Sequence, residues 1–112
     1  MRKKSLITIL VIIAVIILSI IILTRSHPNA PENVAKCIGE NSILYTQLGC
    51  HACEYQEDLF GENYQYLNVV DCFFDREICI EKEIKGTPTW IINDKEYLGA
   101  RSIEELKILT GC

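Results

Sequence analysis

The sequence lacks the signatures of several common kinds of site. It has no glycine-rich phosphate loop, no Ser/His/Asp set and no basic patch, and it contains only two histidines. It has no internal repeat and no low-complexity stretch. These absences argue against a phosphate-loop nucleotide site and against a triad hydrolase, and they leave the cysteines as the candidate reactive groups.

Charge is missing altogether from Leu6 to Leu23, where the only polar residues are Thr8 and Ser19. Eighteen such residues form a helix of about 27 Å, close to the hydrocarbon thickness of a bilayer. Three basic residues precede the run and Arg25 is the only basic residue that follows it closely. This asymmetry predicts a single-pass anchor in the cell membrane, with a cytoplasmic N-terminus and the rest of the chain outside.

A cleaved signal peptide is the alternative reading of this segment. It usually has a shorter apolar core and a small-x-small cleavage site, and the Pro- and Asn-containing segment 26–31 offers no clean site. No cysteine comes just after the run to serve as a lipid anchor. A buried core helix is disfavoured because Ile, Val and Leu cover every face. We therefore expect three parts: a basic tip and anchor (1–25), a linker (26–31) and an extracytoplasmic domain (32–112).

The outer part of the chain has few positive charges. Residues 1–25 hold four of the eleven basic residues and no acidic residue, so the remainder carries a formal charge of −8, against −4 for the whole chain. This balance argues against nucleic acid as a partner and against docking on anionic lipid. An acidic surface that keeps the domain soluble is the simplest interpretation.

All the cysteines lie in this outer part. An even number in a small extracytoplasmic domain indicates disulfides, although six cysteines allow 15 full pairings. They are Cys37, Cys50, Cys53, Cys72, Cys79 and Cys112.

The hydrophobic pattern predicts the order β-α-β-α-β-β-α, with a parallel first pair of strands and a closing antiparallel hairpin in a four-stranded mixed sheet. Ser102 and Glu105 have the spacing of a capping box at the last helix. The expected strands are 42–46, 64–70, 89–93 and 96–98, and the expected helices are 32–38, 50–60, 76–85 and 103–110.

The motif Cys50-His51-Ala52-Cys53 follows a predicted strand and begins a predicted helix. Unpaired N–H groups and the helix dipole favour a thiolate at this position, so the motif predicts a thioredoxin-like redox site. Cys50 is the expected nucleophile and Cys53 the resolving thiol. An inert structural disulfide is the alternative. His51 either helps to stabilise the Cys50 thiolate or is an exposed residue with no role.

Together with Thr87-Pro88 about 35 residues later, and with a closing hairpin and helix, this motif resembles the thioredoxin superfamily. More closely, residues 34–112 resemble the thioredoxin-like domains fused to, or partnered with, quinone-linked vitamin K epoxide reductase homologues. The matching pieces are residues 35–37, Tyr45, Cys50, Cys53, 60–61, 71–72, Cys79, 87–93, 97–99, 102–106 and 110–112.

The resemblance implies an α/β thioredoxin-like fold that binds no cofactor and no metal. It implies that Pro88 is cis and faces the two cysteines, and that the Thr87 backbone pairs with a substrate peptide. On sequence alone, a trans proline at the start of a strand is also open. The resemblance further implies a disulfide between Cys72 and Cys79, which we expect to be a structural clamp rather than an electron shuttle.

Cys37 and Cys112 bracket the domain, and pairing them would tie the last helix to the entry segment. Such a bond would contribute about 2–4 kcal/mol because it closes a long loop. Pairing with another molecule is the alternative.

The chain departs from the expected family pattern at the motif itself. The pattern is Cys-Pro-His-Cys after tryptophan, whereas this chain has Gly49 before the motif and His51-Ala52 inside it. The buried acid of cytoplasmic thioredoxins is replaced by Leu44. The redox potential therefore does not carry over, and proton transfer at Cys53 must use another group or water.

The expected function is a membrane-anchored thiol–disulfide oxidoreductase that introduces disulfides into cysteine-containing extracytoplasmic proteins. A quinone-linked membrane reductase of the vitamin K epoxide reductase type would reoxidise it. The same site could serve a reductase or an isomerase. In a different class, Cys50, Cys53, Cys72 and Cys79 could hold a structural zinc in a non-catalytic domain. Haem attachment is excluded because residue 54 is Glu.

Overall fold

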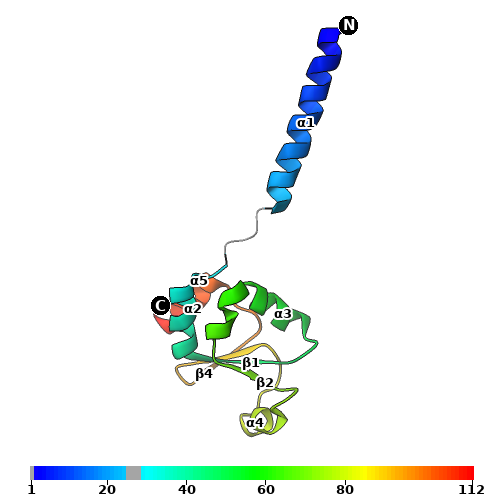
Figure 1. The fold of residues 1–112 in the computed structure, drawn as a ribbon. Coiled ribbons are helices and arrows are strands. Elements are labelled where there is room, and N and C mark those ends of the chain that lie inside the picture. The colour runs from blue at the N-terminus through cyan, green and yellow to red at the C-terminus, as the bar shows by residue number, and fades with distance from the viewer. Residues whose placement is uncertain (1, 25–28) are drawn as a thin grey trace.

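The structure is a computed structural model, and it describes residues 2–24 and 29–112. Its first element is α1 (Arg2–Thr24), a helix without any buried residue (Figure 1). The mean hydropathy of its most apolar window is 3.6, and it is the one helix in the described ranges long and apolar enough to cross a membrane. Half of the expected linker, residues 26–28, lies outside the described residues.

A single sheet of four strands forms the centre of the domain that follows α1. The strand order is β2 (Val69–Asp71), β1 (Ser42–Thr46), β3 (Thr89–Ile92) and β4 (Lys95–Leu98). Strands β1 and β2 are parallel, whereas β3 is antiparallel to both β1 and β4. The predicted α/β thioredoxin-like fold with a mixed sheet is therefore confirmed.

Helices cover the sheet unequally on its two sides. Figure 1 shows α2, α3 and α5 together on one side of the sheet and the short α4 on the other. The 3₁₀ helix η1 packs against both α2 and α3. The bounds are α2 (Glu32–Glu40), α3 (His51–Asp58), η1 (Gly61–Tyr66), α4 (Arg76–Glu81) and α5 (Ile103–Thr110).

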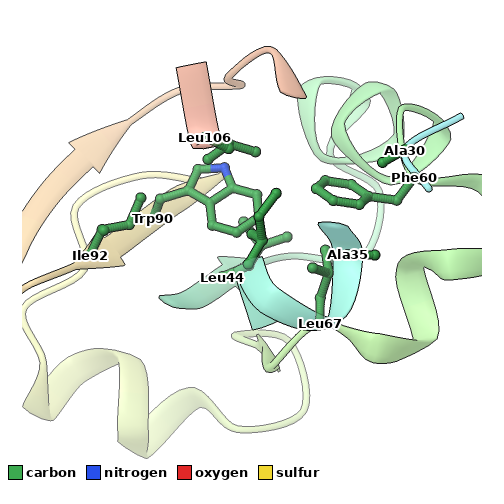
Figure 2. Packing of buried hydrophobic residues seen from close by; sticks show 9 residues of the cluster. Ala30, Ala35, Leu44, Phe60, Leu67, Trp90, Ile92 and Leu106 are labelled. Carbon is green, nitrogen blue, oxygen red and sulfur yellow. The ribbon is translucent and has the colours of Figure 1, made fainter. Parts of the chain in front are cut away.

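The hydrophobic core lies between the sheet and this helical layer (Figure 2). Trp90 and Ile92 point the same way because alternate residues of a strand share a face, and Leu44 of β1 shares this face because it is paired with Trp90 across the sheet. Each is at most 1% exposed, and the Phe60 ring lies 6.2 Å from the Trp90 ring, centroid to centroid. The core therefore links β1 and β3 to the end of α3.

The predicted strand over residues 64–70 is wrong. Residues Gly61–Tyr66 form η1, and only Val69–Asp71 are a strand. The backbone of Tyr66 lies so close to Gly39 of α2 that a Cβ on this glycine would collide with the Tyr66 carbonyl oxygen. The Lys36 ammonium group also lies over the Tyr66 ring, 4.7 Å from the ring centroid. Packing against α2 thus overrides the strand propensity of the tyrosines.

Two other local predictions concern the end of α4 and the turn between β3 and β4. The helix expected over residues 76–85 ends at Glu81, and Glu83 has a φ of 54°. The predicted hairpin turn is confirmed: Asn93 and Asp94 both have positive φ, as a two-residue type I′ turn requires, and Ile92 pairs with Lys95.

The capping box at α5 forms only in part. Ser102 is the N-cap, and its Oγ accepts a hydrogen bond from the Glu105 backbone N–H at 3.2 Å. The Glu105 carboxylate turns instead to the Arg101 guanidinium, at 2.9 Å. Of the two hydrogen bonds of a capping box, the one that the Ser102 side chain accepts is therefore present.

Candidate active site at the start of helix α3

The position of Cys50 is set by the turn that follows β1. Gly49 adopts a φ of 82° there, and the Cys50 N–H donates to the Gln47 carbonyl at 3.2 Å. Cys50 is the N-cap of α3, and its Sγ accepts a hydrogen bond from the Cys53 backbone N–H at 3.2 Å. The sulfur therefore lies at the positive end of the helix, where backbone N–H groups stabilise a thiolate.

The two sulfurs of the motif differ in accessibility. Cys50 and Cys53 are joined in a disulfide, with their Cα atoms 5.2 Å apart. Cys50 is half-buried, whereas Cys53 is 5% exposed. An incoming thiolate can therefore reach the Cys50 sulfur, whereas the buried Cys53 sulfur reacts with the Cys50 sulfur from within the protein.

The loop before β3 completes the site. The Thr87–Pro88 peptide bond is cis, and the Cys50 Sγ lies 3.6 Å from the Thr87 carbonyl oxygen. Pro88 is buried, and its carbonyl accepts from the Gly99 N–H at 2.8 Å, which ties the loop to the residue after β4. The fold therefore places Thr87, which follows Cys50 by 37 residues, and the adjacent Pro88 next to the cysteine pair.

His51 lies at the rim of the site. Its side chain is 99% exposed, and its Nδ1 lies 3.7 Å from the Glu54 carboxylate. No hydrogen bond joins it to Cys50 in the part of the chain that the structure describes. An exposed pair of this kind contributes little to stability.

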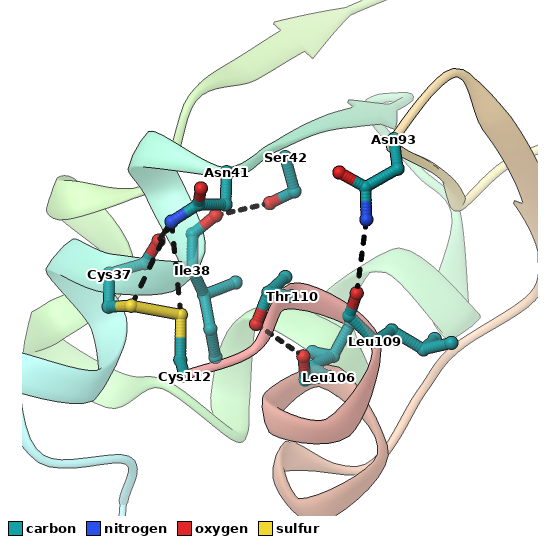
Figure 3. Close-up of a disulfide and its surroundings, with 9 residues drawn as sticks. All are labelled: Cys37, Ile38, Asn41, Ser42, Asn93, Leu106, Leu109, Thr110 and Cys112. Atoms are coloured by element: carbon teal, nitrogen blue, oxygen red, sulfur yellow. Dashed lines mark hydrogen bonds between the residues drawn. A yellow bond between two sulfur atoms is a disulfide. The ribbon is translucent and has the colours of Figure 1, made fainter.

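The other four cysteines pair away from the motif, in the two pairs that the sequence analysis expects. Cys72 and Cys79 join the residue after β2 to α4, with Cα atoms 5.7 Å apart. Cys37 and Cys112 join α2 to the end of α5, at 5.9 Å (Figure 3).

The four cysteines of the alternative zinc site are therefore divided between two disulfides. Within residues 2–24 and 29–112, no group of three or more His, Cys, Asp or Glu side chains is placed to hold a metal ion.

Gln56 is a residue of this site that the sequence analysis missed. Its side chain is fully buried, and its Oε1 accepts from the Trp90 indole N–H at 2.9 Å and from the Arg101 N–H at 2.7 Å. Its Nε2 donates to the Arg101 carbonyl at 3.0 Å. Helical spacing could have found it, because Gln56 lies between Cys53 and Phe60 on the inward face of α3.

A cavity of about 320 Å³ lies behind the buried cysteine. Its lining includes Cys53, Glu57, Tyr64 and Asp71. Burial, and then the nearby Glu57 and Asp71 carboxylates, raise the pKa of Tyr64 to about 12. The Tyr64 phenol therefore stays neutral at physiological pH, beside carboxylates.

The chain is similar to a plant thiol-disulfide oxidoreductase. It is 36% identical over 98 residues to thiol-disulfide oxidoreductase LTO1 of Arabidopsis thaliana, a match that covers 77% of this chain. The chain spans about a quarter of that relative, 26% of its length. No protein-family model matches the sequence.

Solved structures with a similar backbone were also found. Oxidised thioredoxin from Plasmodium falciparum superposes with a TM-score of 0.47 and 20% identity, over 73% of this chain and 90% of that chain. Alkylhydroperoxide reductase AhpF from Enterococcus faecalis, as its C503A mutant, gives 0.46 and 19%, over 75% of this chain and 45% of that chain.

Proposed function

We propose that this chain is a membrane-anchored thiol–disulfide oxidoreductase that introduces disulfides into cysteine-containing proteins outside the cytoplasm. The observation that carries the proposal is the placement of the Cys50 sulfur. It accepts a backbone N–H at the start of α3 and lies 3.6 Å from the Thr87 carbonyl oxygen, while its partner Cys53 is buried. The similarity to a named thiol-disulfide oxidoreductase supports it.

The proposed reaction is two successive thiol–disulfide exchanges. A substrate thiolate attacks the Cys50 sulfur, which breaks the Cys50–Cys53 bond and releases Cys53 as a thiolate that takes up a proton. A second substrate thiolate then attacks the substrate sulfur of the mixed disulfide, and Cys50 leaves as a thiolate. The substrate loses two electrons and gains a disulfide, and the protein gains the two electrons as a dithiol.

The location and the electron acceptor are further parts of the proposal. The apolar helix α1 would be the single-pass anchor, with the basic tip in the cytoplasm. A quinone-linked membrane reductase of the vitamin K epoxide reductase type would accept the two electrons, an expectation that rests on the resemblance of residues 34–112. An extracytoplasmic location agrees with a chain whose cysteines are paired.

The redox potential of the Cys50–Cys53 pair tests the direction of the reaction. The full-length protein in detergent micelles is equilibrated in glutathione buffers, and the oxidation state of the peptide carrying both cysteines is read by mass spectrometry. A value above about −200 mV supports a disulfide donor. A value near or below about −270 mV would replace the proposal with a reductase.

The order of attack and the membrane partner have separate tests. Mixed with the disulfide-linked dimer of a cysteine peptide, Cys53→Ser should accumulate a mixed disulfide at Cys50 and release the other peptide as a thiol, and Cys50→Ser should form none. Reduced protein in quinone-containing liposomes should be reoxidised only when a reductase of the vitamin K epoxide reductase type is present. Equal reoxidation without that enzyme would contradict the partner assignment.

A further inference from the structure

The buried cysteine of the motif must exchange a proton in every catalytic cycle. Cys53 leaves as a thiolate when the disulfide opens, and as a thiol it must be deprotonated before it can attack. It is 5% exposed, so bulk water reaches it poorly. Leu44 of β1 is 1% exposed within the apolar core, so this strand position supplies no carboxyl group.

The cavity behind Cys53 provides a route for the proton. It is lined by Cys53, by polar groups of α3, η1 and the ends of β1 and β2, and by the apolar side chains of Leu48 and Val69. Its volume of about 320 Å³ has room for several water molecules, each of which takes about 30 Å³ in the liquid. A proton can therefore pass from the thiol to a carboxylate in the lining without a direct contact between the two side chains.

Two of the three carboxylates in the lining already have partners. Asp71 Oδ1 accepts the backbone N–H groups of Phe73 at 2.8 Å and Leu48 at 3.3 Å, so it fixes the loops at this edge of the sheet. Glu54 lies 3.7 Å from the His51 ring at the rim.

Glu57 is the third carboxylate of the cavity lining. It follows Cys53 by four residues, so both side chains project from the same face of α3. Within the described ranges, no salt bridge and no side-chain hydrogen bond engages its carboxylate. Glu57 is itself exposed, so a proton that it receives can leave to solvent. The negative charge of Glu57 also contributes to the raised pKa of the nearby Tyr64 phenol.

We propose that Glu57 exchanges the proton of the Cys53 thiol through this cavity. The inference rests on the proposed function. When Cys50 holds a partner in a mixed disulfide, the Cys53 proton passes through cavity water to the Glu57 carboxylate. The Cys53 sulfur then attacks Cys50, the Cys50–Cys53 bond forms, and the partner sulfur leaves as a thiolate. The proton takes the reverse path when the disulfide opens.

The test is a pre-steady-state measurement on the full-length protein in detergent micelles. Reduced protein is mixed with 2-hydroxyethyl disulfide between pH 5 and pH 9, quenched with acid, and analysed by mass spectrometry for the mixed disulfide at Cys50 and for its resolution. Glu57→Gln is compared with Asp58→Asn, a control that removes an exposed carboxylate from the same helix outside the cavity lining. Glu57→Asp keeps the carboxyl group.

Glu57→Gln should slow the resolution step by roughly tenfold to a hundredfold, at or below the lower end of the usual contribution of a general base. Glu57→Asp should recover most of the rate, and Asp58→Asn should match the wild type. A Glu57→Gln rate equal to that of Asp58→Asn, or a Glu57→Asp rate as slow as that of Glu57→Gln, would overturn the inference.

A second readout does not depend on turnover. In a Cys50→Ser background, the pKa of the Cys53 thiol is measured from its alkylation rate against pH. Removing the nearby negative charge with Glu57→Gln should lower this pKa, and an unchanged pKa would count against the inference. A wild-type protein that forms no mixed disulfide at Cys50 would instead refute the proposed function. Normal wild-type exchange with an unaffected Glu57→Gln refutes only the role of Glu57.

Discussion

Replacing Gln56 by methionine should destabilise the domain that follows α1 strongly, although the two side chains are similar in size. The change removes three hydrogen bonds and leaves the Trp90 indole N–H and the Arg101 backbone N–H without their acceptor. Each buried unsatisfied group costs about 1–3 kcal/mol. Trp90 is fully buried and Arg101 is half-buried, so we expect a loss of about 3 kcal/mol in the free energy of unfolding.

Urea unfolding of the full-length protein in detergent micelles measures this loss. The fluorescence of Trp90, the only tryptophan, reports on the domain that follows α1 and not on α1 itself. With an m-value of about 1.5 kcal/mol/M, a loss of about 3 kcal/mol lowers the midpoint by about 2 M. Gln65→Met, at an exposed glutamine of η1, is the matched control and should leave the midpoint unchanged. Equal midpoints for both variants would refute the hydrogen-bond argument.

Three further outcomes are expected in the same unfolding assay. Replacing both Cys37 and Cys112 by serine should lower stability by about 4 kcal/mol, since their bond closes a loop across 75 positions, and an unchanged midpoint would contradict this. Gly39→Ala should cost about 1–3 kcal/mol because its Cβ meets the Tyr66 backbone, whereas no loss would show that η1 moves aside freely. The raised pKa of Tyr64 means that the folded state keeps its proton between about pH 10 and pH 12 while the unfolded state loses it. The free energy of unfolding of the wild type should therefore fall as the pH rises across that range, and the free energy of unfolding of Tyr64→Phe should fall less steeply.

Sequence patterns predicted those parts of the fold that local chemistry determines. The short continuous apolar runs of β1 and β3, the hairpin turn at Asn93-Asp94 and the Ser102 cap each specify a conformation within a few neighbouring residues, and all are present. The position of Cys50 at the start of a helix was predicted in the same way.

What the sequence did not reveal depends on contacts between distant segments. The tyrosines of η1 have strand propensity, and only the packing of Tyr66 against Gly39 and Lys36 makes their segment helical. Helical spacing places Gln56 on the inward face of α3, but its partners Trp90 and Arg101 are brought to it only by the folded chain. The cavity behind Cys53 likewise arises from segments that meet only in the folded chain.

The bond between Cys37 and Cys112 makes residues 37–112 a covalent ring (Figure 3). A protease that cuts a loop inside this ring opens it without releasing a fragment, because both pieces stay attached through the two sulfurs. A nicked molecule would migrate as one species on a non-reducing gel and as two after reduction. The domain can therefore be cleaved once on its surface and still keep every part of the site on a single covalent body.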